Sequence, residues 1–242
     1  MTLNVSKIPQ QGGGKKFEDP AALDPGTYPA RVVNVIGLGL QLQQAFKGEP
    51  KPPAQKLMTT YEFVDEFLKD EGGEDDTSKP RWLSEDFPLF SLESDLATST
   101  KRYLAIDPTK KFGGDWGQVA GQPCMVTLVQ NAGKGKNEGR IFNNISSVQT
   151  MRLKEQGNCP ELVNPPKVFD FYEPNLDVFL SLNSYVQGLI KEGLDFEGSK
   201  LQALIKAHEG GSAGVGAKDT EKATEGASQD VSDSTVDEEV DW

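Results

Sequence analysis

Residue types on which many enzymes and metal sites depend are scarce in this sequence. Its 242 residues include one histidine, His208, and two cysteines, Cys124 and Cys159, which lie 35 positions apart. His208 follows the last apolar repeat, where nothing rigid would orient a general base, and the cysteines lack the spacing of a metal site. No catalytic triad and no P-loop pattern is readable. The sequence therefore predicts no enzymatic activity, no metal and no cofactor.

Long apolar runs are also missing. No stretch approaches the roughly 18 apolar residues of a membrane-spanning helix, and the N-terminus lacks the apolar segment of a secretory signal. Cys124 lies in the short apolar run PCMVTLV and is expected to be a small buried hydrophobe. We expect a cytoplasmic protein with reduced cysteines and no membrane contact.

Basic charge is scarce mainly at one end of the chain. The net charge is −12, but the segment from Glu209 to Trp242 holds ten acidic residues against two lysines. Residues 1–208 hold 27 acidic and 23 basic residues and are nearly balanced. The composition of residues 209–242 predicts a disordered acidic tail. An indole has no folding role in such a segment, so we expect Trp242 to be bound by a partner.

Five segments have the β-branched and aromatic content of strands. They cover residues 27–40, 57–68, 81–90, 122–130 and 140–148. A helix is predicted over residues 95–106, where Lys101 and Arg102 would point away from its apolar face, and Asp107-Pro108 ends it. Five strands with a helix after the third are the pattern of the OB-fold, a partly open Greek-key barrel. A different antiparallel α+β fold remains the alternative.

The remaining segments predict the domain organisation. We expect a flexible arm over residues 1–22, the barrel over 23–158, a helical extension over 159–208 and the acidic tail over 209–242. Within the extension, residues 163–168 (VNPPKV) are predicted to be an extended linker, and Gly188, Gly193 and Gly198 divide the apolar repeats into short helices. The extension either packs on the barrel or offers an association surface, for example in a homodimer.

Basic residues concentrate around the predicted barrel and aromatic residues lie among them, a combination typical of proteins that bind single-stranded nucleic acid. Cations follow the phosphates, and aromatic faces stack on bases. The candidate contacts are Arg31, Lys56, Tyr61, Arg81, Trp82, Lys101, Arg102, Lys111, Phe112, Trp116, Lys134, Lys136 and Arg140. Phe112 and Trp116 are the preferred stacking platforms because their neighbours are glycines. Tyr61 fits the core as well as the surface, and Lys134 and Lys136 lie in a loop too polar to bury.

A cationic groove and an acidic tail on one chain suggest a switch. The tail can occupy the groove at high effective concentration when nucleic acid is absent. Nucleic acid would displace it and free Trp242 for partners. Local patches rather than net charge decide such contacts.

Three groups of residues give the chain a resemblance to a known family. They are the entry strand GTYPARVVNVIGLGLQ (26–41), the segments YEFVDEF and RWLSEDFPLF, and the terminal DEEVDW. In these features the chain resembles bacteriophage single-stranded DNA-binding proteins of the OB-fold type. The resemblance covers residues 24–150 and the tail, and it does not extend to residues 160–208.

The resemblance implies a sequence-nonspecific protein that coats and protects single-stranded DNA in phage replication, recombination and repair, in the cytoplasm of an infected bacterium. It also implies that the tail recruits DNA polymerase and primase-helicase. The tail residues in that role would be Asp237, Glu238, Glu239, Asp241 and Trp242. Family members commonly end in phenylalanine, where this chain has Trp242.

Two other functions remain open at this point. An acidic interaction protein or DNA mimic would have no affinity for single strands. A metal-dependent nuclease would need converging carboxylates, and carboxylates cluster in the acidic turn at residues 71–76. A solvated turn is the simpler interpretation of that cluster.

Overall fold

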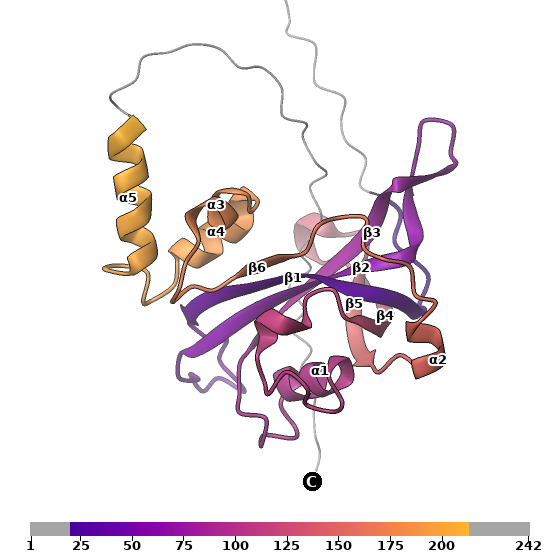
Figure 1. Cartoon of the computed structure of the whole chain (residues 1–242), viewed down its shortest axis with the longest axis horizontal. Helices are drawn as coiled ribbons and strands as arrows, with labels where there is room; N and C mark the ends of the chain where they lie inside the picture. Colours follow the sequence, from indigo (N-terminus) through magenta and orange to yellow (C-terminus); the bar gives the residue numbers. More distant parts are fainter. Residues whose placement is uncertain (1–19, 213–242) are drawn as a thin grey trace, which may run out of the picture.

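A computed structural model of the chain describes residues 20–212 (Figure 1). The N-terminal arm up to residue 19 and the acidic tail from residue 213 lie outside the described residues, so the predictions for Asp237 to Trp242 are not tested by it. Within the described part, no helix is long and apolar enough to cross a membrane.

The fold is built on five long antiparallel strands. They are β1 (Gly26–Gln41), β2 (Ala54–Lys69), β3 (Asp75–Pro88), β4 (Pro123–Ala132) and β5 (Ile141–Gln149). Their order in the sheet is β3-β2-β1-β4-β5, and helix α1 (Thr98–Ile106) lies between β3 and β4 in the chain. The five predicted strands and the helix after the third are therefore confirmed. Across the described residues no ladder joins β3 to β5, so the sheet is a curled half-barrel.

The central strand β1 has partners along both edges. One edge pairs with β2 from Ala30 to Gln41. The other edge pairs first with β4, from Gly26 to Arg31, and then bonds to the turn at Gly121–Gln122 through Val32. A short strand, β6 (Lys167–Phe169), takes over in parallel at residues 34–36. The prediction of a linker over residues 163–168 is therefore wrong at its end, because β1 has a free edge where β4 departs.

Two apolar cores lie on opposite faces of the sheet. The first fills the half-barrel under α1 and includes Tyr61, Phe63 and Tyr103. The second lies on the other face, where Ile36 and Leu38 of β1 meet the C-terminal helices. These helices are α3 (Leu176–Leu180), α4 (Ser184–Lys191) and α5 (Lys200–Ser212). The helical extension thus packs on the sheet, and Figure 1 shows it above the left-hand end of β1.

Three local details differ from the prediction. Strand β3 begins at Asp75, six residues early, because the turn tightens where Asp70 Oδ1 accepts from the backbone of Gly72 (2.8 Å) and Glu74 (3.0 Å). Gly188 lies inside α4 and divides nothing. Residues between the main elements also form short helices. These are α2 (Leu153–Gln156), η2 (Trp116–Val119) and η3 (Gly135–Asn137).

Candidate nucleic-acid interface

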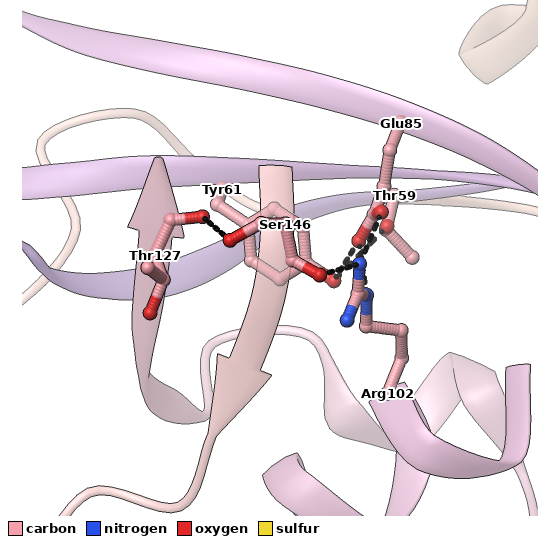
Figure 2. A network of polar contacts seen from close by, with 6 residues as sticks. All are labelled: Thr59, Tyr61, Glu85, Arg102, Thr127 and Ser146. Carbon is pink, nitrogen blue, oxygen red and sulfur yellow. Dashed lines mark hydrogen bonds and ion pairs between the residues drawn. The ribbon is translucent and has the colours of Figure 1, made fainter. Parts of the chain in front are cut away.

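Two of the predicted contact residues lie inside the half-barrel. Arg102 enters from α1 and forms a two-point ion pair with Glu85 of β3, Nε to Oε1 at 2.9 Å and Nη2 to Oε2 at 3.1 Å (Figure 2). The Tyr61 hydroxyl donates to Glu85 Oε1 at 3.0 Å, and Arg102 Nη2 also reaches the Ser146 carbonyl of β5 at 3.4 Å. Tyr61 and Arg102 are therefore held in the interior, and the expectation that Arg102 points away from the apolar face of its helix is wrong. Burial raises the pKa of Tyr61 well above its usual value.

Arg31 is also buried, on the outer face of β1. Its guanidinium donates to the carbonyls of Cys159 (2.9 Å) and Pro160 (2.7 Å). One strand over, the buried Glu62 carboxylate accepts from the backbone of Val163 at 2.7 Å. These two side chains tie residues 159–164 across the outer face of β1 and β2. Arg31 is thereby occupied by internal bonds and is not presented to a ligand.

The two preferred stacking platforms lie at the edge of the first core. The Trp116 ring packs against Tyr103 (centroids 5.3 Å apart) and Phe87 (5.6 Å), which leaves it half-buried. Phe112 is half-buried as well, and Lys111 Nζ lies 4.9 Å from its ring centroid. The glycines around them did not predict this burial, because the contacting rings come from β3 and α1.

Trp82 lies on the outer face of β2 and β3. The Thr60–Ser84 bond (2.9 Å) and the Lys56–Asp86 ion pair (2.9 Å) identify that face. Strand alternation places Trp82 beside Ser84 on it, half-buried and outside both core clusters. Lys56 is present there, but its charge is paired. The outer face thus offers one aromatic surface, with Glu62 directly opposite Trp82 on β2 and with hydroxyl groups and the Lys56–Asp86 pair further along the strands.

The β1–β2 loop carries a phenylalanine flanked by lysines, and none of these residues is among the predicted contacts. Phe46 and Glu49 exchange two backbone bonds of 2.9 Å around Lys47 and Gly48, both with positive φ (49° and 85°). Such a two-residue turn suits asparagine and glycine. Lys47 Nζ and Lys51 Nζ lie 5.4 and 4.8 Å from the centroid of the Phe46 ring, within cation–π range. An aromatic residue between lysines in a Pro- and Gly-rich loop was the available sequence signal.

The β4–β5 loop carries a second group of this kind. Lys134, Lys136 and Arg140 are exposed, and the Arg140 guanidinium lies 5.1 Å from the centroid of the Phe142 ring. Because β4 continues four residues past Leu128, which pairs with Gly26, this loop lies beyond the start of β1. The β1–β2 loop lies beyond its end. The two groups therefore occupy opposite ends of the central strand.

The remaining candidates are dispersed. Lys101 is exposed on α1, away from the outer face. Arg81 is half-buried, and burial lowers its pKa although the nearby Glu66 favours its charge; burial also raises the pKa of Glu66. The tip of the β2–β3 hairpin is acidic and internally paired: bonds from Lys79 and Ser78 lower the pKa of Asp76 to about 2. The β2–β3 hairpin tip therefore has an excess of carboxylates, whereas the β1–β2 and β4–β5 loops hold more cations than carboxylates.

Among residues 20–212, no group of three or more histidine, cysteine, aspartate or glutamate side chains could hold a metal ion. In and beside the acidic turn, Asp75 and Asp76 pair with Lys69 and Lys79, and Asp70 accepts from backbone amides. No protein-family model matches the chain, and no curated protein sequence matches it.

Proposed function

We propose that the protein binds single-stranded DNA without sequence preference, along the outer face of β2 and β3 and between the two basic loops. The observation that carries the proposal is the pair of cation-capped phenylalanines, Phe46 and Phe142, at opposite ends of β1. Aromatic faces stack on any base, and adjacent cations neutralise phosphates. Trp82 lies on the face between them and supplies a third aromatic surface.

The half-barrel supports this proposal because its strand order and helix position are consistent with an OB-fold. That fold binds oligonucleotides with the face of its second and third strands and with the loops after the first and fourth strands. The basic groups lie in those two loops. The proposed interface therefore comprises Phe46, Lys47, Lys51, Trp82, Lys134, Lys136, Arg140 and Phe142. It omits Arg31, Tyr61 and Arg102, whose buried bonds hold the fold together.

The backbone at Lys47 gives independent support. Positive φ is uncommon outside glycine, asparagine and aspartate, and costs other residues roughly 1–2 kcal/mol. Asparagine would relieve this strain at the first central position of the turn. A lysine held in a strained conformation at a loop tip is consistent with a use for its charge.

The substitution Lys47→Asn tests the proposal. It should leave the free energy of unfolding unchanged or slightly raised, and weaken binding to labelled oligo-dT by about 3–10-fold at low salt. The slope of log affinity against log salt should become shallower by about 0.7, the value expected for one lost phosphate contact on a single strand. Anisotropy titrations at several salt concentrations measure the affinity and the slope, and urea unfolding measures the free energy of unfolding.

Lys79→Ala is the matched control, because Lys79 is an exposed lysine paired with Asp76 on the acidic hairpin. It should change neither affinity nor slope. Binding by the unaltered protein that does not depend on salt, or no binding at all, would contradict the proposal. The second result would instead favour an acidic interaction protein.

The proposed function also includes a role for the acidic tail, which follows from its composition. We assign to residues 213–242 the recruitment of replication proteins such as DNA polymerase and primase-helicase, in the cytoplasm of an infected bacterium. The nine acidic residues of this segment also make it a competitor of DNA for the basic loops.

A further inference from the structure

The helical extension holds both roots of the β1–β2 loop. At the first root, the Leu40 amide donates to Asp195 Oδ1 at 3.0 Å, and the Leu40 carbonyl accepts from Leu194 at 2.8 Å. At the second root, Gln55 donates to the Tyr172 hydroxyl, which in turn donates to Asp195 Oδ2 at 2.6 Å. The Asp195 carboxylate therefore joins the last residues of β1 to the first residues of β2, directly at Leu40 and through Tyr172 at Gln55.

The two roots face each other in the sheet, which makes this contact a clamp on the loop. Leu40 and Gln55 are directly paired across β1 and β2. Beyond them, the loop has few bonds of its own: the Phe46–Glu49 turn, and Gln43 Nε2 donating to Pro52 at 2.6 Å. The angle at which the loop leaves the sheet thus depends on bonds from outside it.

The strand is shaped to admit the clamp. Gly39 has φ of +76°, and a Cβ there would come within 2.8 Å of Asp195 Oδ1 and 3.3 Å of the Phe171 ring. The register of β1 and β2 shifts between Gly37 and Gly39, where the strand bulges. The bulge at Gly39 therefore leaves room for the Asp195 carboxylate beside the Leu40 amide that it accepts from.

We infer that Asp195 and Tyr172 are positioning residues that set the direction of the β1–β2 loop toward single-stranded DNA. The helical extension is then the scaffold of one end of the interface. This inference rests on the proposed function, because it gives the loop a ligand. Lys47 and Lys51 contact the phosphates. The clamp determines whether these lysines can reach the same DNA strand that lies on the outer face of β2 and β3.

The substitution Tyr172→Phe removes the hydroxyl that links Gln55 to Asp195 and keeps the ring, which packs edge-on against Phe171 at 5.2 Å. In the DNA-free protein, amides of residues 40–55 should exchange with solvent about 3–10-fold faster, as the loss of one hydrogen bond implies. Amides of α1 and of residues 26–32 should be unchanged. Tyr28→Phe is the matched control, because Tyr28 donates to Asp24 at the other end of β1.

The same variant should lose the salt dependence that the loop contributes. Its slope of log affinity against log salt should be shallower by about 1.4, the value for two phosphate contacts on a single strand. Replacing both Lys47 and Lys51 by alanine should give the same slope, and adding that change to Tyr172→Phe should reduce it no further. Asp195→Asn, which weakens both roots, should show the larger effect on exchange.

Three results are decisive against the inference. If amides of residues 40–55 exchange equally fast in Tyr172→Phe and in the unaltered protein, the Tyr172 hydroxyl does not hold the loop. Exchange that accelerates everywhere alike identifies a general loss of stability. An unchanged salt slope, in a variant that still binds DNA, removes the positioning role alone. A failure of the unaltered protein to bind single strands overturns the proposed function, and with it the ligand assigned to the loop.

Discussion

At the scale of single residues, the least expected feature is a charged pair inside the half-barrel. Glu85 and Arg102 are both buried, and their pairing satisfies two charges that would be costly to bury alone. Within the described part of the chain, no buried side-chain nitrogen or oxygen lacks a hydrogen-bond partner. Arg102 also contacts the carbonyl of Ser146, so it bridges β3 and β5 where no ladder joins them. The pair thus links the two strands in place of a hydrogen-bonded ladder.

The Tyr61 hydroxyl makes this network sensitive to alkaline pH. The folded-state pKa of Tyr61 is raised well above the value of about 10 expected in the unfolded chain. The unfolded chain therefore loses its proton first, so the contribution of Tyr61 to stability is complete below pH 10 and declines as pH rises toward the folded pKa. Above pH 10 this one group should lower the free energy of unfolding by about 1.4 kcal/mol per pH unit.

Tyr61→Phe should therefore cost about 1–3 kcal/mol at pH 7, since Glu85 loses a donor. The same variant should show a shallower decline of stability above pH 10 than the unaltered protein. Urea unfolding at neutral pH and at two pH values above 10 measures both effects. Parallel declines in the two proteins would show that Tyr61 does not titrate on unfolding.

Individual buried polar residues were the hardest to predict. Strand alternation placed Tyr61 on the same side as Leu57 and Phe63, which left the core and the surface equally open. Arginine is almost never fully buried without a partner, and the partner of Arg102 lies on a strand 17 residues away in the chain. Helix periodicity alone could not show that the barrel interior would present a carboxylate to it.

At the scale of elements, β1 is the part on which the others depend. Its edges bind β2, β4 and β6 in turn, and its end receives Asp195 from the helical extension. Gly37 and Gly39 lie in this strand, and its register against β2 shifts between them. Their second role, to allow close approach of the segment around Phe169 and Phe171, requires partners more than 130 residues further along the chain.

Gly39→Ala should destabilise the protein by about 2–4 kcal/mol. The positive φ accounts for about 1–2 kcal/mol of this, and the collision with Asp195 and Phe171 for the rest. Gly73→Ala is the matched control, because Gly73 has φ of +85° and nothing lies within 4 Å of its added Cβ. Chemical denaturation measures both, and equal losses would show that the space beside Gly39 is not restricted.

Long elements were predictable and short ones were not. The five strands and α1 have enough alternating or apolar residues to be recognised from their own composition. β6 has three residues and follows two prolines, and it exists only because β4 leaves the edge of β1 free after Arg31. The β1–β2 turn was missed for a similar reason: a strained Lys47 is not a turn signal.

At the scale of the whole molecule, charge is divided between loops and segments. The basic loops lie at the two ends of β1, the β2–β3 hairpin is acidic, and the segment beyond Ser212 holds nine acidic residues against two lysines. A net charge of −12 is therefore compatible with a cationic interface. In the proposed function, the acidic segment and DNA compete for the same lysines.

Deletion of residues 213–242, which keeps α5 whole, should tighten binding to oligo-dT by roughly ten-fold at low salt, because a tethered competitor is removed. The gain should shrink as salt screens the competition. A full-length variant with the tail carboxylates changed to amides should show the same gain while keeping Trp242. Weaker binding after deletion, measured by anisotropy, would show that the segment does not compete.

The sequence by itself determined the five strands, the helix after the third and the separation of a balanced body from an acidic tail, because these depend on local composition and periodicity. It also identified the β4–β5 loop, which is too polar to bury. Tertiary structure decided which cations are available. Arg31 donates to carbonyls and Arg102 pairs with a carboxylate, all from distant segments. Phe46 and Lys47 lie in a turn whose roots are held by Asp195 and Tyr172. Long-range partners make these choices, and they are absent from any local pattern.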